Sequence, residues 1–219
     1  MAAIGEDRRG GQVAGAAVTV PAPRAAAEPT TPRPEPGRSL ALRCRIRRAE
    51  GHHGGVRLYE AAFTADVTGA VGGVAGCARV AVVPAWDIGA FEALDRISWD
   101  LSAAAHTLSR WGHTLDWLQG RGANGLAIVE TVEVRPQWRG RRIGYLGTAL
   151  MLDALRVGLS GAVLFPMAPG ASGDSRSASH ERLTAYWARL GFRPWMDGHL
   201  SLPLADGTLR QAAALLADD

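Results

Sequence analysis

The segment 132–151, VEVRPQWRGRRIGYLGTALM, constrains the fold more than any other part of the chain. Its first residues alternate apolar with polar, which predicts a half-buried strand, and Pro136 lacks the N–H needed to continue the strand's ladder. Apolar residues then return at helical spacing, at Ile143, Leu146, Leu150, Ala154 and Val157. This spacing predicts a helix that begins near Arg141 or Arg142 and buries that apolar face. The segment is therefore a strand, a turn and a helix.

The turn is rich in arginine and glycine and lies at the predicted start of that helix. A helix start leaves about four backbone N–H groups without partners and carries a partial positive charge, so it attracts phosphate. Gly140 and Gly144 have no side chain, which lets a bulky anion approach the main chain. Arg139, Arg141 and Arg142 can donate paired hydrogen bonds to phosphate oxygens. The turn is therefore predicted to bind a diphosphate, with an exposed basic loop before an ordinary helix as the alternative.

A second segment, 183–195 (LTAYWARLGFRPW), predicts a short helix that ends at Gly191, since glycine is a common helix C-cap. The two segments together resemble the GNAT superfamily of acyl-CoA N-acyltransferases. The matching residues are Val132, Val134, Pro136, Arg139, Gly140, Ile143 and Gly144 in the first motif and Gly191 and Phe192 in the second. The resemblance implies an α/β fold with a mixed sheet. It also implies that the turn binds the CoA pyrophosphate through main-chain amides, and that the preceding strand splays from its neighbour to bind the pantetheine arm.

Two positions depart from the family pattern. Arg142 stands where the family usually has a glycine, and we expect it to have ordinary helical φ and ψ there. Trp187 stands four residues before Gly191, where many members have a tyrosine that protonates the leaving thiolate, and an indole cannot do this. Tyr186 is one residue away, which on a helix is about 100° of rotation, so it is expected to face elsewhere. The general acid is therefore unassigned.

The resemblance implies that an amine attacks the thioester of acetyl-CoA, or of another acyl-CoA, directly. Glu130 lies two residues before Val132, which puts it on the strand face of Val132 and Val134, near the expected thioester position. It is the first candidate for the base. Glu133 points to the other face and is the weaker choice, although a one-residue bulge would exchange the two. His180, expected just before the last helix, stands where the family often has an asparagine that contacts CoA.

Composition excludes several chemistries. All 24 basic residues counted as Lys or Arg are arginine, which excludes a P-loop, pyridoxal enzymes and Schiff-base aldolases. The net charge of +3 and the scattered arginines do not call for nucleic-acid binding. Two cysteines, no secretory pattern and no run of about 18 apolar residues predict a cytoplasmic protein outside the membrane. Cys44, His52 and His53 lack the spacing of zinc sites, so no metal is expected.

Residues 1–38 are rich in Ala, Pro and Arg and are predicted to form a disordered arm, with 39–219 as one domain. The elements expected in that domain are strands at 40–48 and from 56, a glycine-rich hairpin connection at 69–76 followed by a strand, helices within 87–119, strands at 126–135, 162–167 and 198–204, and a polar loop at 172–179. The helical region precedes the motif strand, whereas many relatives carry their acceptor-site helices earlier, so the acceptor is not predicted.

Two other functions stay open at this stage. A CoA-binding fold without a general acid would serve as an inactive regulatory or interaction module. The basic turn would also suit a different nucleotide or an anionic partner. The oligomeric state, a homodimer among the options, does not follow from the sequence.

Overall fold

The computed structural model describes residues 40–49, 54–67, 70–84, 88–115, 125–168, 174–204 and 209. The arm predicted over 1–38 and the pair His52 and His53 lie outside the described residues. The strands are β1 (Leu40–Arg48), β2 (Arg57–Val67), β3 (Ala70–Pro84), β4 (Gly125–Val134), β5 (Gly161–Leu164), β6 (Arg193–Pro194) and β7 (Leu200–Pro203). The helices are α1 (Ile88–Leu94), α2 (Trp99–Trp111), α4 (Ile143–Leu155) and α5 (Asp174–Ala188), with short 3₁₀ turns η1 (Gly112–Thr114), η2 (Pro136–Trp138) and η3 (Met196–Gly198).

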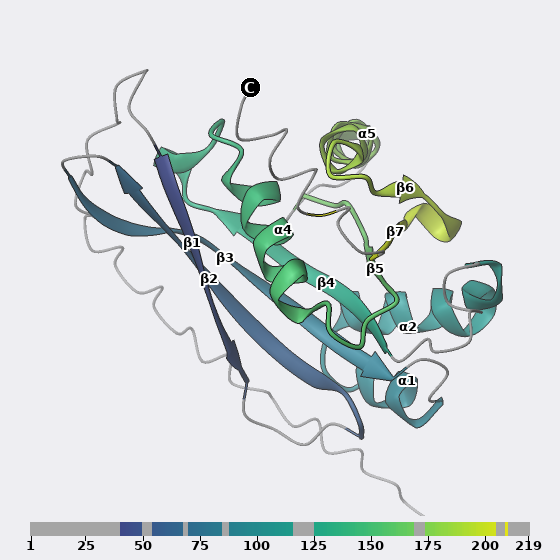
Figure 1. Ribbon diagram of the computed structural model, residues 1–219. Helices are drawn as coiled ribbons and strands as arrows, with labels where there is room; N and C mark the ends of the chain where they lie inside the picture. The colour runs from purple at the N-terminus through teal and green to yellow at the C-terminus, as the bar shows by residue number, and fades with distance from the viewer. Residues whose placement is uncertain are drawn as a thin grey trace, which may run out of the picture. The chain divides into compact units, whose positions relative to one another are not determined.

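The described strands form one seven-stranded sheet in the order β1-β2-β3-β4-β5-β7-β6 (Figure 1). Neighbouring strands are antiparallel except β4 and β5, which are parallel because the chain crosses between them through α4. The predicted mixed α/β class is therefore confirmed. The helical region before the motif strand forms two helices, and the Ser98 side chain caps α2 by accepting from the Leu101 N–H at 3.2 Å.

Two groups of helices cover opposite faces of the sheet. Helices α4 and α5 pack on the face that presents Phe63, Val80 and Val129. Helices α1 and α2 pack on the other face, against Leu58, Ile128 and neighbouring residues. Figure 1 shows α4 lying across the central strands, with α1 and α2 beyond them. The alternation of buried residues along each strand therefore separates two hydrophobic cores, one on each face.

Three predicted boundaries are wrong. The stretch 69–76 is not a hairpin connection, because β3 already begins at Ala70; a side chain at Gly76 would strike the Glu133 carbonyl of β4, so glycine suits a strand there. Strand β5 ends at Leu164, short of the predicted 167. Helix α5 begins at Asp174, so much of the predicted polar loop at 172–179 is helical.

The buried face of α4 also differs from the predicted stripe. Leu150 is 38% exposed and Val157 is 92% exposed. Ile143 is buried as predicted and Leu146 is partly buried, whereas Tyr145, Ala149, Met151 and Leu152 fill the rest of the core. Gly147 allows this placement, because a Cβ there would lie only 2.7 Å from the ring of Phe63. The close contact between Gly147 and Phe63 of the sheet therefore sets the rotation of the helix, and the spacing of hydrophobic residues does not reveal such a contact.

Candidate active site

Strand β4 carries a β-bulge at Glu130. Val129 pairs with Val80 and Thr131 pairs with Arg79, which leaves Glu130 as the extra residue without a partner on β3. The bulge shifts the alternation by one position: Val129 packs with the α4–α5 core, and so do Val132 and Val134 beyond it. Glu130 and Glu133 therefore share the opposite face, the one on which α1 and α2 pack. The prediction that Glu130 faces the same side as Val132 is wrong for this reason.

Arg79 of β3 pairs with the Glu130 carboxylate. Its Nε lies 3.3 Å from Oε2, and its Nη1 donates to Oε1 at 3.4 Å. The Glu130 side chain is 4% exposed and the Arg79 side chain 36% exposed. Within the described residues Oε2 has no hydrogen-bond partner of good geometry. The bulge therefore buries a carboxylate beside a guanidinium, with both carboxylate oxygens close to Arg79 nitrogens.

A cavity of about 500 Å³ opens where β4 and β5 part. The two strands pair only from Leu126↔Gly161 to Val129↔Leu164; beyond this β4 continues to Val134 while β5 ends. The residues that line the cavity are Asp100, Ala104, Ile128, Val129, Glu130, Thr131, Val132, Glu133, Leu164, Phe165, Pro166, Met167, Ala168, Leu183 and Trp187. Asp100 belongs to α2 on one face of the sheet, whereas Trp187 belongs to α5 on the other. The cavity therefore reaches both faces of the sheet through the gap between the strands.

The turn between β4 and α4 contains two residues with left-handed backbone. Gly140 has φ +78° and Arg142 has φ +63°. The expected right-handed conformation of Arg142 is therefore wrong, because the chain must bend before Ile143 can start the helix. A Cβ at Gly140 would meet nothing within 4 Å, so the main chain there is open to a ligand. Among the described residues we find no acceptor for the amides of Gly140, Ile143 or Gly144, which fits an anion-binding turn.

We expect Arg142→Gly to be more stable than Arg142→Ala by about 1 kcal/mol, since a Cβ in the left-handed region clashes with the following carbonyl and glycine removes that clash. Both variants lose the same charge, so each is the control for the other. Urea unfolding of the two variants measures the difference. Equal free energies of unfolding would mean that the left-handed turn is not present in solution.

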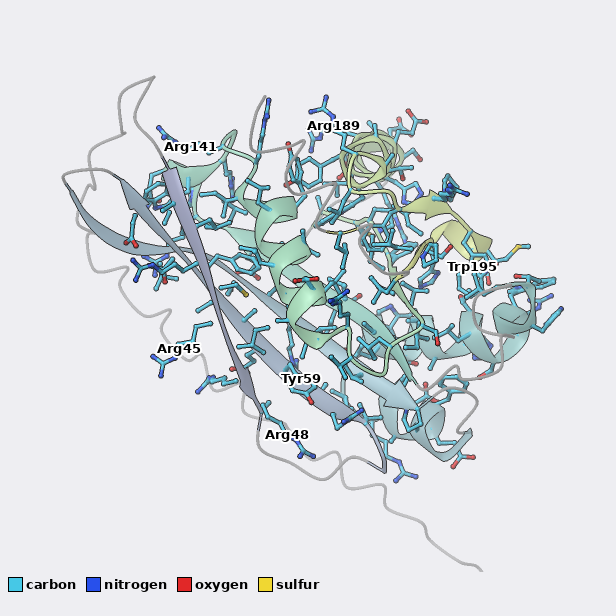
Figure 2. The ribbon with its side chains drawn as sticks, in the orientation of Figure 1. Arg45, Arg48, Tyr59, Arg141, Arg189 and Trp195 are labelled. Atoms are coloured by element: carbon cyan, nitrogen blue, oxygen red, sulfur yellow. The ribbon has the colours of Figure 1, made fainter. Side chains whose placement is uncertain are left out.

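Two arginines of the turn, Arg139 and Arg141, have different surroundings. Arg139 Nε donates to the Val134 carbonyl at 3.1 Å, which ties the turn to the end of β4. The Arg141 guanidinium lies 5.7 Å from the ring centre of Trp138, which is itself buried at 4% exposure. Figure 2 shows Arg141 near the start of α4, whereas Arg45 and Arg48 extend from β1. The turn therefore carries basic side chains beside an open main chain.

Tyr186 reaches the same helix start from α5. Its hydroxyl oxygen accepts a hydrogen bond from the Tyr145 N–H at 2.9 Å. A Cβ at Gly144 would lie 2.5 Å from that oxygen, so this glycine makes room for Tyr186 as well as baring the backbone. Burial raises the pKa of Tyr186 to about 12, although the Tyr145 N–H acts to lower it. Tyr186 therefore contacts the start of α4 and, as expected, is not among the described residues that line the cavity beside Trp187.

Trp187 follows directly and lines the cavity at 7% exposure. Tyr186 therefore contacts the start of α4, whereas the next residue, Trp187, lines the cavity. The described lining of the cavity contains no tyrosine, cysteine or histidine. The general acid remains unassigned, and a leaving thiolate would have to take its proton from water.

His180 lies within α5, whereas the sequence predicted that it lies just before the last helix. It lines a second cavity of about 370 Å³ together with Arg176, Glu181 and Asp197. This cavity shares Phe165 and Met167 with the first, but His180 is not in the lining of the first. The role of His180 toward CoA stays a prediction.

The buried His199 lies near this second cavity. It is 3% exposed, its ring centre lies 5.0 Å from that of Phe165, and within the described residues neither ring nitrogen has a hydrogen-bond partner. Burial lowers the pKa of His199 below its usual 6.5, although the Met196 backbone and Asp197 act to raise it. The ring is therefore held neutral in the folded protein.

We expect the protein to lose stability as pH falls below 6.5, because the unfolded histidine then binds a proton that the folded one resists. Above pH 6.5 the neutral His199 makes its full contribution to the free energy of unfolding. A His199→Phe variant should show a shallower loss of the free energy of unfolding in urea between pH 7.5 and 5, and His106→Gln, at an exposed histidine of α2, serves as the control. The same slope in wild type and His199→Phe would contradict the neutral buried ring.

Sequence reasoning raised the bulge only as an alternative and missed two other features of the site. Both of these, the partner Arg79 and the lining residue Asp100, depend on contacts between segments far apart in the chain. One signal was present: Arg79 interrupts the apolar run CARVAVVP, and an arginine in a buried strand requires a partner. Among the described residues no group of three or more His, Cys, Asp or Glu could hold a metal ion, and no helix is long and apolar enough to cross a membrane.

Comparison with known proteins gives a distant likeness. No protein-family model and no curated protein matches this chain. Among solved structures, the chain is similar to one described as an insect arylalkylamine N-acetyltransferase 7 from the yellow fever mosquito Aedes aegypti, with 14% sequence identity and a TM-score of 0.37. The match covers 66% of this chain and 64% of that one, so the chain spans less than two thirds of the mosquito protein. We therefore base the functional assignment on the geometry of the chain itself.

Proposed function

We propose that this protein is a GNAT-like N-acetyltransferase, which transfers the acetyl group of acetyl-CoA directly to an amine. The observation that carries the proposal is the cavity between β4 and β5, which is reached from both faces of the sheet. A direct transfer requires two substrates to meet without a covalent enzyme intermediate. A cavity open to α5 on one face and to α2 on the other gives each substrate its own approach.

The α4–α5 face suits the nucleotide end of acetyl-CoA, which would supply the activated acetyl thioester. The turn offers the amides of Gly140, Ile143 and Gly144 together with Arg141 and Arg142 as the site for the pyrophosphate. The exposed backbone of β4 near Val132 and Val134 continues from this turn toward the cavity. The residues present therefore fit a CoA molecule that extends along α5 with its thioester end in the gap.

The α1–α2 face suits the acceptor. Glu130 would accept the proton of the amine nitrogen, directly or through water, as the N–C bond forms and the C–S bond breaks. Arg79 contacts both oxygens of the carboxylate and holds it in place. Glu133 lines the same cavity and is the weaker alternative.

A second candidate function is a CoA-binding module without turnover. Trp187 favours it, because this residue lines the cavity at the position where the resemblance implies a proton donor, and an indole has no suitable proton. Binding of acetyl-CoA without acetylation of any amine would support that function.

The proposal is tested by following free thiol release from acetyl-CoA with a panel of primary amines, and by detecting the acetylated amine by mass spectrometry. Transfer above the hydrolysis rate is expected for at least one amine. Dephospho-CoA and ADP serve as competitors, because a turn that binds another nucleotide would prefer one of these. Hydrolysis alone, across the whole panel, would contradict the enzyme assignment.

A further inference from the structure

The cavity lining carries an excess of negative charge. Asp100, Glu130 and Glu133 all line it, and no arginine, lysine or histidine is among the described lining residues. Arg79 pairs with Glu130 from the neighbouring strand. Asp100 and Glu133 have no ion pair within the described residues. Among the described residues, neither of these two carboxylates therefore has a cation within ion-pair distance.

Glu130 distinguishes this group from a set of surface acids. Its side chain is 4% exposed, belongs to a residue that lines the cavity, and is ion-paired with Arg79, whose Nε lies 3.3 Å from Oε2. Glu130 therefore adds a buried carboxylate, paired with Arg79, to the two exposed acids of the lining.

The other walls of the cavity are apolar. They comprise Leu164, Phe165, Pro166, Met167, Leu183 and Trp187, from the end of β5 and from α5. Such walls favour methylene groups over further polar groups. A volume of about 500 Å³ admits a small molecule next to the thioester end of CoA. The lining thus combines acids on the α2 and β4 side with an apolar surface opposite them.

We infer that the acceptor is a dicationic amine, a primary amine whose aliphatic chain carries a second ammonium group. This inference rests on the proposed function. The nitrogen that is acetylated lies by Glu130, and the second ammonium is held by Asp100 at the start of α2, with Glu133 adding to the negative potential. An acceptor with a carboxylate at its far end is repelled by the same charges.

The inference is tested with three acceptors of equal chain length, 1,6-diaminohexane, hexylamine and 6-aminohexanoate. We expect kcat/KM for thiol release to be about twofold to fivefold higher for the diamine than for hexylamine, and lowest for the amino acid, because an ion pair at an exposed site contributes modestly. Asp100→Asn should lower the diamine value and bring the ratio of diamine to hexylamine toward one. Asp95→Asn, an exposed acid outside the cavity lining, is the matched control and should leave the ratio unchanged.

Binding is measured separately, as the thermal shift with each amine in the absence of acetyl-CoA. A larger shift with the diamine than with hexylamine in wild type, reduced in Asp100→Asn, supports the inference. Equal shifts together with equal kcat/KM values for the two amines would overturn it. A preserved preference in binding without thiol release would instead overturn the proposed function alone, so the two failures are distinguishable.

Discussion

Replacing Glu130 with glutamine is expected to lower kcat/KM for acetyl transfer by about a hundredfold or more, the usual contribution of a positioned general base. Glutamine keeps the size of the side chain but cannot accept the amine proton. Arg79 then loses its ion pair, yet this residue is 36% exposed and can be solvated, so the fold should survive. The steady-state rate with a saturating amine and acetyl-CoA measures the effect.

Glu133→Gln is the matched control, because Glu133 lines the same cavity and shares the face of Glu130. It is exposed and has no arginine partner within the described residues, so its replacement should cost less than about tenfold. An unchanged rate in Glu130→Gln, with a large loss in Glu133→Gln, would assign the base to Glu133. Circular dichroism and unfolding curves confirm that both variants are folded before their rates are compared.

Replacing Arg79 with methionine is expected to destabilise the protein by about 2 to 3 kcal/mol. The change leaves the Glu130 carboxylate, 4% exposed, without its cation, and an uncompensated buried charge is costly. We place the cost below that of a fully buried pair, because Arg79 is partly exposed and the cavity admits water. Urea unfolding at neutral pH measures the loss.

The double variant Arg79→Met with Glu130→Gln separates charge from packing. Since glutamine carries no charge to be left unpaired, the double variant should recover most of the stability lost by Arg79→Met alone. Arg79→Lys keeps the cation and should lose less than Arg79→Met. A double variant no more stable than the single one would mean that Arg79 acts through packing alone.

Much of the fold follows from local patterns. The alternation in 40–48 and 126–135 predicts β1 and β4, and the turn chemistry around Pro136 and Gly140 predicts the start of α4 close to its observed position. These features depend on neighbours in the chain, so the sequence contains them directly. The glycines near 70–76 misled the prediction, because glycine in a strand marks close approach of another backbone as often as it marks a turn.

The features that define the site depend on contacts across the sheet. The bulge at Glu130 reverses the faces assigned by simple alternation, and it is specified by pairing with β3. The left-handed Arg142 breaks the expectation that a non-glycine residue avoids positive φ. Tyr186 reaches Tyr145 because two helices pack together, a contact that rotation angles along one helix do not predict. The turn could therefore be located from sequence, whereas the cavity and its charges could not.

Binding of acetyl-CoA to the β4–α4 turn is tested most directly by thermal unfolding with and without saturating acetyl-CoA, in wild type and in Gly140→Asp with Arg142→Glu. A ligand at about a hundred times its dissociation constant adds roughly 2.7 kcal/mol, which for a domain of this size raises the midpoint by about 5 to 11 °C. We expect that rise in wild type and its loss in the double variant, where two acids face the phosphates. An unchanged midpoint in folded wild type would contradict the assignment of the β4–α4 turn to CoA.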